Sequence, residues 1–177
     1  MKKFQLFLFI CAALGLSACN GKADNNTTNE SNADNEQVAE ALADGNTFEG
    51  ANFSLVYPKE LTETYSSETM LNADDKSGNY CHIDATWNDS GATISQLPEY
   101  AKNWKGMKEK DGCTVDEPVI NDKILTIKAV KDGKVELHFV VMKEDRLGVT
   151  GSLKFDAGKE SQYEPVLKSI IASVKFK

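Results

Sequence analysis

Residues 124–143 read ILTIKAVKDGKVELHFVVMK, and this stretch decides the fold class. Asp132-Gly133 divides it into two runs, Ile124–Lys131 and Lys134–Lys143. A type I′ turn needs positive φ at both of its central residues, and Asp-Gly is one of the pairs that accept this conformation. The stretch therefore predicts two antiparallel strands joined by a tight hairpin.

The flanking segments extend this hairpin into an antiparallel meander. A strand is expected at Thr114–Ile120, with a turn at Asn121-Asp122. Glu144-Asp145 turns the chain into a last strand at Leu147–Phe155. Three more strands are expected nearer the N-terminus: Phe53–Tyr57 (stopped by Pro58), Tyr65–Leu71 and Tyr80–Asn88.

The Tyr80–Asn88 segment alternates between two faces. Successive side chains of a strand point to opposite sides, so residues two apart share a face. One face carries Cys81, Ile83, Ala85 and Trp87; the other carries Tyr80, His82, Asp84 and Thr86. The first face is expected to be buried.

Two amphipathic helices accompany these strands. The first is expected over Ile94–Lys108, with Ser95 as N-cap and Asp111-Gly112 after its end. Its face is formed by Ile94, Leu97, Ala101, Trp104 and Lys108, all apolar except the last. The second has one broad apolar stripe: Tyr163, Val166, Leu167, Ile170, Ile171 and Val174.

The start of the second helix has two interpretations. Ser161 and Glu164 suit a capping box, whereas Pro165 suits the first helical position. These interpretations differ by about three residues, and both remain open at this point.

Strands, a helix, an antiparallel meander and a final helix predict an α+β domain with helices packed on an antiparallel sheet. Residues 47–177 resemble the PsbP-like fold, an α/β/α sandwich. The resemblance is carried by the segment NFSLVYP at 52–58, Trp104, the Asp132-Gly133 hairpin and the Tyr163–Phe176 helical segment. The fold is named for an extrinsic subunit of photosystem II and is shared by a nuclear-import factor that binds the GTPase Ran. The resemblance implies a fold, and only weakly a function.

The N-terminus reads as an export signal. Lys2 and Lys3 precede the apolar run Phe4–Gly15, which is shorter than the roughly 20 residues of a membrane span. Leu16-Ser17-Ala18-Cys19 follows and resembles the lipobox of bacterial lipoproteins. The resemblance implies a signal peptide over residues 1–18 and attachment of acyl chains at Cys19. The alternative is an ordinary secretory signal in which Cys19 is an unmodified thiol.

Residues 19–45 are expected to be the lipidated cysteine and a disordered tether, before one globular domain over residues 46–177. The tether is rich in Asn and contains no aromatic residue, so it has little apolar surface to bury. By resemblance to Gram-negative sorting rules, Asn20 favours the outer membrane. The expected localisation is the cell envelope.

Charge excludes some partners. Without Lys2 and Lys3 the chain carries 18 basic and 27 acidic residues, a net charge of −9, and residues 46–177 carry −4. Nucleic-acid binding needs clustered Lys and Arg to displace counterions, and no basic stripe occurs here. We therefore expect no nucleic-acid partner.

Few residues suggest chemistry. His82 and Asp84 share a strand face and His138 lies on another strand, so a two-His, one-carboxylate metal site is conceivable. Isolated histidines are more often packed or solvated, and we predict no metal, no cofactor and no catalytic residue. The pairs Asp74-Asp75 and Asp116-Glu117 are expected to be solvated turn residues, and Trp87 and Trp104 to be core residues.

Cys81 and Cys113 remain once Cys11 is assigned to the signal peptide and Cys19 to the anchor. An oxidising compartment favours a disulfide between them, and the alternative is two buried thiols that never meet.

Taken together, the sequence predicts an envelope lipoprotein whose domain is a non-enzymatic binding or accessory module with a protein partner. Two alternatives stay open: an envelope enzyme or metal-binding protein using the His82/Asp84 face, and an inhibitor or structural partner of a secreted protein.

Overall fold

The computed structural model describes Leu42 and residues 44–76 and 80–177 of the chain. The predicted signal peptide, Cys19 and most of the predicted tether lie outside these residues. The strands are β1 (Asn46–Glu49), β2 (Phe53–Tyr57), β3 (Leu61–Ser67), β4 (Met70–Asp75), β5 (Cys81–Trp87), β6 (Thr114–Val115), β7 (Val119–Asn121), β8 (Ile124–Lys131), β9 (Lys134–Lys143), β10 (Arg146–Asp156) and β11 (Lys175–Phe176). The helices are the 3-10 helix η1 (Ile94–Gln96), α2 (Leu97–Lys110) and α3 (Glu160–Ser173). None of the helices in this part of the chain has the length and apolarity needed to cross a membrane.

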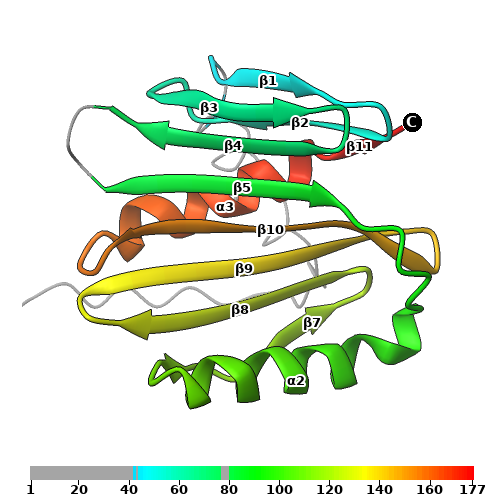
Figure 1. Ribbon diagram of the computed structural model, residues 1–177, viewed down its shortest axis with the longest axis vertical. Coiled ribbons are helices and arrows are strands. Elements are labelled where there is room, and N and C mark those ends of the chain that lie inside the picture. The colour runs from blue at the N-terminus through cyan, green and yellow to red at the C-terminus, as the bar shows by residue number, and fades with distance from the viewer. Residues whose placement is uncertain (1–41, 43, 77–79) are drawn as a thin grey trace, which may run out of the picture.

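The strands form one long antiparallel sheet and one short sheet. The long sheet has the order β3-β4-β5-β10-β9-β8-β6, with β7 also paired to β8, and the short sheet has the order β1-β2-β11. The β8–β9 hairpin forms as predicted, and Asp132 and Gly133 both have positive φ, 49° and 72°. Figure 1 shows α3 behind the long sheet and α2 along its lower edge. The α+β architecture with helices packed on an antiparallel sheet is therefore confirmed.

Two hydrophobic cores lie on opposite faces of the long sheet. The larger core packs Tyr163, Leu167 and Ile170 of α3 against the sheet and against β2. The smaller core packs Leu97 and Ala101 of α2. Its sheet residues come from β8, β9 and the start of β10: Leu125, Ile127, Val140, Met142 and Leu147.

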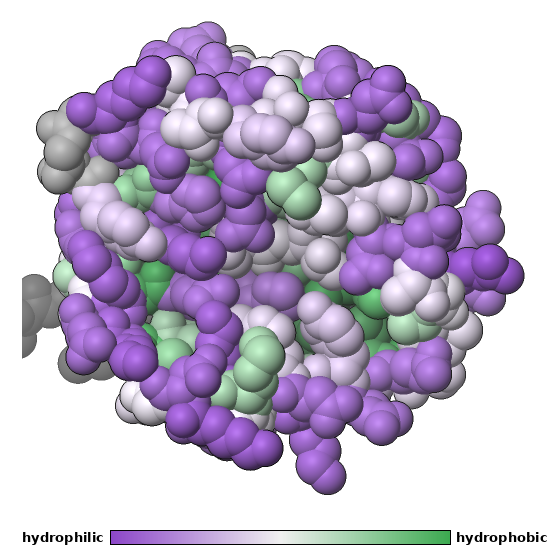
Figure 2. All heavy atoms as spheres, viewed as in Figure 1, coloured by the Kyte–Doolittle hydropathy of each residue, from purple (hydrophilic) through white to green (hydrophobic). Residues whose placement is uncertain are grey.

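Strand β9 is consequently buried on both of its faces. Phe139 belongs to the core under α3 and Val140 to the core under α2, and neither side chain is exposed to solvent. Strand β5 differs, because Cys81, Ile83 and Ala85 are buried while the residues between them are half-buried. This second face of β5 and of its neighbours is largely hydrophilic (Figure 2).

Several predicted boundaries are wrong for local reasons. The strand expected at Tyr65–Leu71 is the β3–β4 hairpin, with a turn at Glu68-Thr69. Long-range hydrogen bonds hold this turn: Ala51 N–H donates to the Glu68 carbonyl, and Trp87 N–H donates to the Thr69 carbonyl. The strand expected at Thr114–Ile120 is split into β6 and β7 around Pro118, which cannot donate a ladder hydrogen bond.

Both helix starts also differ from expectation. Thr93, rather than Ser95, caps the first helical segment, in a capping box with Gln96. Helix α3 begins at Glu160, so Pro165 lies inside it, and neither interpretation of its start was right. The pairing of β11 with β2 was not anticipated.

The predicted disulfide is absent, because Cys81 and Cys113 are both free thiols. Cys81 is buried in the core under α3, where burial raises the pKa of its thiol to about 11. Cys113 lies between α2 and β6, at the far edge of the sheet. Four strand spacings separate β5 from β6, about 19 Å. A disulfide needs Cα atoms within about 7 Å, so the prediction is wrong for this fold.

Gly151 gives a test of the packing on β9. It lies in β10 between Ala85 and Phe139, and a Cβ atom there would overlap the Asp84 carbonyl and lie 2.7 Å from Phe139 Cζ. We expect Gly151→Ala to lower the free energy of unfolding by about 2–3 kcal/mol, because neither the backbone nor the buried ring can move freely. Urea denaturation measures this change.

Gly106→Ala is the matched control. Gly106 lies in α2 and nothing lies within 4 Å of its added Cβ. The same substitution there is expected to stabilise by roughly 0.5–1 kcal/mol through helix propensity. Equal effects at the two positions would show that the packing described around Phe139 is incorrect.

Candidate functional site

The hydrophilic face of the long sheet holds His82, Asp84 and His138, which the sequence analysis considered as possible metal ligands. Cross-strand register places Asn72, Asp84, Ser152 and His138 in one row over β4, β5, β10 and β9. The next row contains Asp74, His82, Lys154 and Glu136. Directly opposed side chains of neighbouring strands lie about 5 Å apart, so each row brings its members into contact.

His82 lies between two carboxylates. Its Nδ1 is 2.5 Å from Asp74 Oδ1, and its Nε2 is 3.6 Å from Asp84 Oδ2. The nearby Asp84 carboxylate is the main reason why the pKa of His82 is raised. The hydrogen bond with Asp74 also raises this pKa, whereas partial burial lowers it. The expectation that Asp74 is only a solvated turn residue is therefore wrong, since it lies in β4 and contacts His82.

Asp84 is the most heavily bonded carboxylate of the face. Burial alone would raise its pKa, but the adjacent His82 imidazole, the hydrogen bond from Ser152 and the nearby Lys154 ammonium lower the pKa to about 2. Lys154 Nζ donates to Asp84 Oδ2 over 3.2 Å, and the Ser152 hydroxyl donates to the same oxygen. Asp84 is therefore ionised at neutral pH and is a weak base.

This order of groups does not activate a nucleophile. A serine hydrolase needs a histidine that accepts the serine proton and a carboxylate that orients the histidine. Here the carboxylate of Asp84 lies between Ser152 and His82, so Ser152 bonds to a weak base. The arrangement is that of an ion-pair network.

His138 is separated from this network by its packing against α2. The Trp104 ring stacks on the imidazole with centroids 4.7 Å apart, and Tyr100 Oη lies 3.0 Å from His138 Nε2. Burial lowers the pKa of His138 to about 4, so the ring is neutral at pH 7. Trp104 is a packing residue, as predicted, and the sequence had not paired it with His138.

The structure does not bring the three candidate metal ligands together. His138 is two strand spacings from His82, about 10 Å, and its Nε2 is engaged by Tyr100. Among the described residues, no group of three or more His, Cys, Asp or Glu side chains is placed to hold a metal ion.

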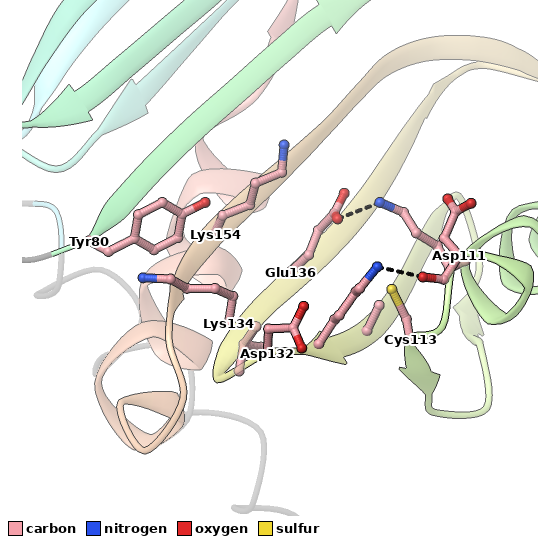
Figure 3. A pocket seen from close by; sticks show the side chains of 11 residues that line it. Tyr80, Asp111, Cys113, Asp132, Lys134, Glu136 and Lys154 are labelled. Atoms are coloured by element: carbon pink, nitrogen blue, oxygen red, sulfur yellow. Dashed lines mark hydrogen bonds and ion pairs between the residues drawn. The ribbon is translucent and has the colours of Figure 1, made fainter.

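A cleft of about 490 Å³ opens at the end of this face, between the C-terminus of α2 and the ends of β8, β9 and β10 (Figure 3). Lys108 Nζ donates to Glu136 Oε2 over 2.5 Å, and Lys131 Nζ donates to the Asp111 carbonyl over 2.6 Å. Lys134 Nζ lies 4.0 Å from the centroid of the Tyr80 ring. The charged side chains that line the cleft are Lys108, Lys131, Lys134, Lys154, Asp111, Asp132 and Glu136.

Charges of both signs alternate in the cleft, so it offers no strong net charge to a ligand. Lys108 has a second role, because its ammonium lies 5.1 Å from the Trp104 ring centroid. It was the one polar member of the predicted apolar stripe of α2, and that departure was the available signal for this contact. Cys113 lines the cleft as a half-buried thiol.

Comparison with known proteins supports the fold. No family model and no curated protein matches the chain. Cyanobacterial PsbP (CyanoP) of Synechocystis sp. PCC 6803 is similar in structure, with a TM-score of 0.52 and 12% identity over 75% of this chain and 92% of the other. This likeness supports the PsbP-like fold predicted from the sequence.

Two more solved structures are similar at lower scores. The Ran-binding protein Mog1p of Saccharomyces cerevisiae has a TM-score of 0.49 and 12% identity, covering 75% of this chain and 95% of its own. A protein of Bacteroides thetaiotaomicron has a TM-score of 0.45 and 15% identity over 75% of this chain. The present chain spans 48% of that Bacteroides protein.

The neutral, buried His138 predicts a loss of stability in acid. Its pKa is about 4 in the folded protein against an ordinary 6.5, so below pH 6.5 the unfolded chain binds a proton that the folded chain does not. The contribution of His138 to stability therefore falls between pH 6.5 and pH 4. Urea denaturation at pH 7.0 and pH 4.5 should show a loss of about 2 kcal/mol from this residue.

His138→Gln isolates that contribution. The variant is expected to be less stable at pH 7 but to lose about 2 kcal/mol less than the native protein on acidification. His82→Gln is the control of opposite sign, because the raised pKa of His82 gives stability that is present in acid and lost as pH rises above that pKa. An unchanged pH profile in His138→Gln would contradict a depressed pKa.

Proposed function

We propose that this chain is a lipid-anchored lipoprotein of the cell envelope whose domain is a non-enzymatic binding or accessory module for a protein partner. One observation carries the proposal for the domain. The ionisable groups on the hydrophilic face bond to one another: His82 to Asp74 and Asp84, Lys154 to Asp84, and Lys108 to Glu136. Asp84, whose pKa is lowered to about 2, is a poor base, and Ser152, which donates to it, is not activated as a nucleophile.

The fold is consistent with this role, although it does not determine it. The architecture provides a long sheet with a helix packed on each face. Function has to be argued from such surfaces rather than from the fold. On this protein the polar face and the cleft of Figure 3 are balanced in charge, so neither is suited to concentrating a charged substrate.

The anchor rests on the sequence alone. The ordered series of Lys2-Lys3, Phe4–Gly15 and the box ending at Cys19 is what lipoprotein processing requires. Two or three acyl chains on one cysteine would hold the protein at a bilayer, because each buried methylene contributes about 0.8 kcal/mol. Asn20 favours the outer membrane as the destination.

Lipidation at Cys19 can be measured directly. Mass spectrometry of protein isolated from native membranes should show an N-terminus at Cys19 with the added mass of acyl chains. Cys19→Ala should release the protein from the membrane fraction or leave it uncleaved, because the acceptor thiol is missing. Cys11→Ala is the matched control and should leave both lipidation and membrane association unchanged. An unmodified N-terminus at another residue would refute the anchor.

The binding role is tested by capture of a partner. The full-length protein, solubilised from membranes in mild detergent and immobilised, should retain a specific envelope protein in near-stoichiometric amount. A captured secreted protein whose activity falls on binding would identify the domain as an inhibitor or structural partner of that protein.

A zinc titration separates binding from metal chemistry. We expect no stoichiometric Zn²⁺ site by calorimetry, because His138 is engaged by Tyr100 and His82 lies in an ion-pair network. A micromolar site that disappears in His82→Ala, with no captured protein, would instead support the metal-binding or enzymatic alternative that uses the His82/Asp84 face.

A further inference from the structure

Strand β7 is an exposed edge of the long sheet. It pairs with β8 on one side, and no other described strand pairs with it. Asn121 and Ile124 close a two-residue hairpin, so they form a hydrogen-bonded pair, and Ile120 and Leu125 form the next, non-hydrogen-bonded pair. The N–H and C=O groups of Ile120 therefore point away from β8.

Two of the three side chains of β7 are apolar and exposed. Val119 is 61% exposed and Ile120 is 41% exposed. Each one lines a different groove, because adjacent residues of a strand point to opposite faces. Ile120 lies in a groove of about 580 Å³ beside α2, with Pro98, Ala101 and Pro118. Val119 lies in a groove of about 280 Å³ beside α3, with Leu167 and Ile171.

Each groove also presents one lysine that has no ion-pair partner among the described residues. Lys102 stands on the rim beside α2, and Lys168 stands on the rim beside α3. The other charged groups of the two rims interact with each other: Lys105 with Glu117 and Glu109, and Lys128 with Asp116 and Glu164. The other charged groups of the two linings are two lysines and four carboxylates, so neither groove is positive as a whole. Lys102 and Lys168 are the local positive charges beside β7 that no described carboxylate pairs with.

We propose that β7 is a docking edge for an extended segment of a partner protein, which adds to the sheet as a further strand. The segment has apolar side chains at successive positions, one entering each groove, and carboxylates that meet Lys102 and Lys168. This inference rests on the proposed binding function and names the surface and the chemistry of the partner.

The geometry favours a strand over a helix as the occupant. A helix presents one stripe of side chains and would fill one groove, leaving the backbone of Ile120 unpaired. An added strand pairs with that backbone and sends alternate side chains to both faces.

The opposite edge of the sheet lacks these features. Strand β3 carries Glu63, a β-bulge between Glu63 and Tyr65, and no exposed large aliphatic residue. A charge and a bulge are ordinary protections of an edge against strand addition. Pro118 similarly ends the pairing surface on one side of β7, so the docked segment is short.

A defined peptide tests the proposal. Acetyl-Glu-Thr-Val-Ile-Val-Thr-Glu-amide carries the stated chemistry, and its binding to the full-length protein in detergent is measured by calorimetry. We expect saturable one-to-one binding. Methylating the amide nitrogens of the central residues, on both edges of the peptide, should weaken its binding about tenfold or more, because the hydrogen bonds to the sheet edge are lost. A peptide with lysine in place of both glutamates should also bind several-fold more weakly, because its charges would face Lys102 and Lys168.

Two substitutions at one residue separate backbone from side chain. Ile120→Pro removes the outward N–H without removing a β7–β8 hydrogen bond, and should abolish binding. Ile120→Ala keeps that N–H and should weaken binding only several-fold. Thermal unfolding of both variants confirms that they fold.

Several results would overturn the docking edge. These are absence of binding, equal binding of the methylated peptide, or unchanged binding to Ile120→Pro. Sedimentation showing a dimer that Ile120→Pro disperses would assign the edge to a second copy instead. If envelope capture still yields a partner when the peptide fails, the binding function stands and only the docking edge is refuted.

Discussion

Burial of β9 on both of its faces is the constraint on which the rest of the fold depends. Phe139 and Val140 are adjacent and fully buried, yet they point to opposite sides of the sheet. Each side therefore needs a helix. Helix α3 covers one side broadly, from β2 to β9, whereas α2 has its contacts at the β6 and β8 end of the other side. The strands beyond α2, which are β4, β5 and most of β10, must then carry polar residues on that second face. The ion-pair network follows from this division, since half-buried charges are stable only when they are paired.

His138 lies at the boundary between the covered and uncovered parts of that face. Its neighbours in the same row are Ile127 under α2 and Ser152 in the polar network. An imidazole is suited to such a position, because its ring stacks on Trp104 while its nitrogens bond to Tyr100 and to the Gly151 backbone. Because the ring is buried at the boundary between these two environments, its charged form is disfavoured and it stays neutral. This contact, with the Lys108–Glu136 pair at the other end of the helix, fixes where α2 lies on the sheet.

The sequence predicts the features that depend on neighbouring residues, and it fails for features that depend on contacts between distant segments of the chain. The Asp132-Gly133 hairpin, the strands beside it and the apolar stripes of both helices depend on turn chemistry and periodicity, and these were found. The turn at Glu68-Thr69 has no glycine, proline or asparagine and is held by Ala51 and Trp87, so it was missed. The disulfide failed for a related reason, because periodicity does not reveal that α2 and α3 lie on opposite faces. Asp74, His82 and Asp84 were all visible in the sequence, but Asp74 is joined to His82 by the pairing of β4 with β5, and β4 was not predicted as a separate strand.

The distribution of polarity over the molecule bears on how it can bind. A face whose charges are already paired must give up those pairs before it can bond to a partner, so it offers little net energy. An edge strand has unpaired backbone groups that water alone satisfies, and exposed aliphatic side chains beside them gain energy when covered. On this protein the first kind of surface lies over β4, β5 and β10, and the second kind lies at β7. Recognition by backbone pairing also tolerates the acidic charge of the domain, because its specificity comes from strand register and side-chain pockets and needs no concentrated field.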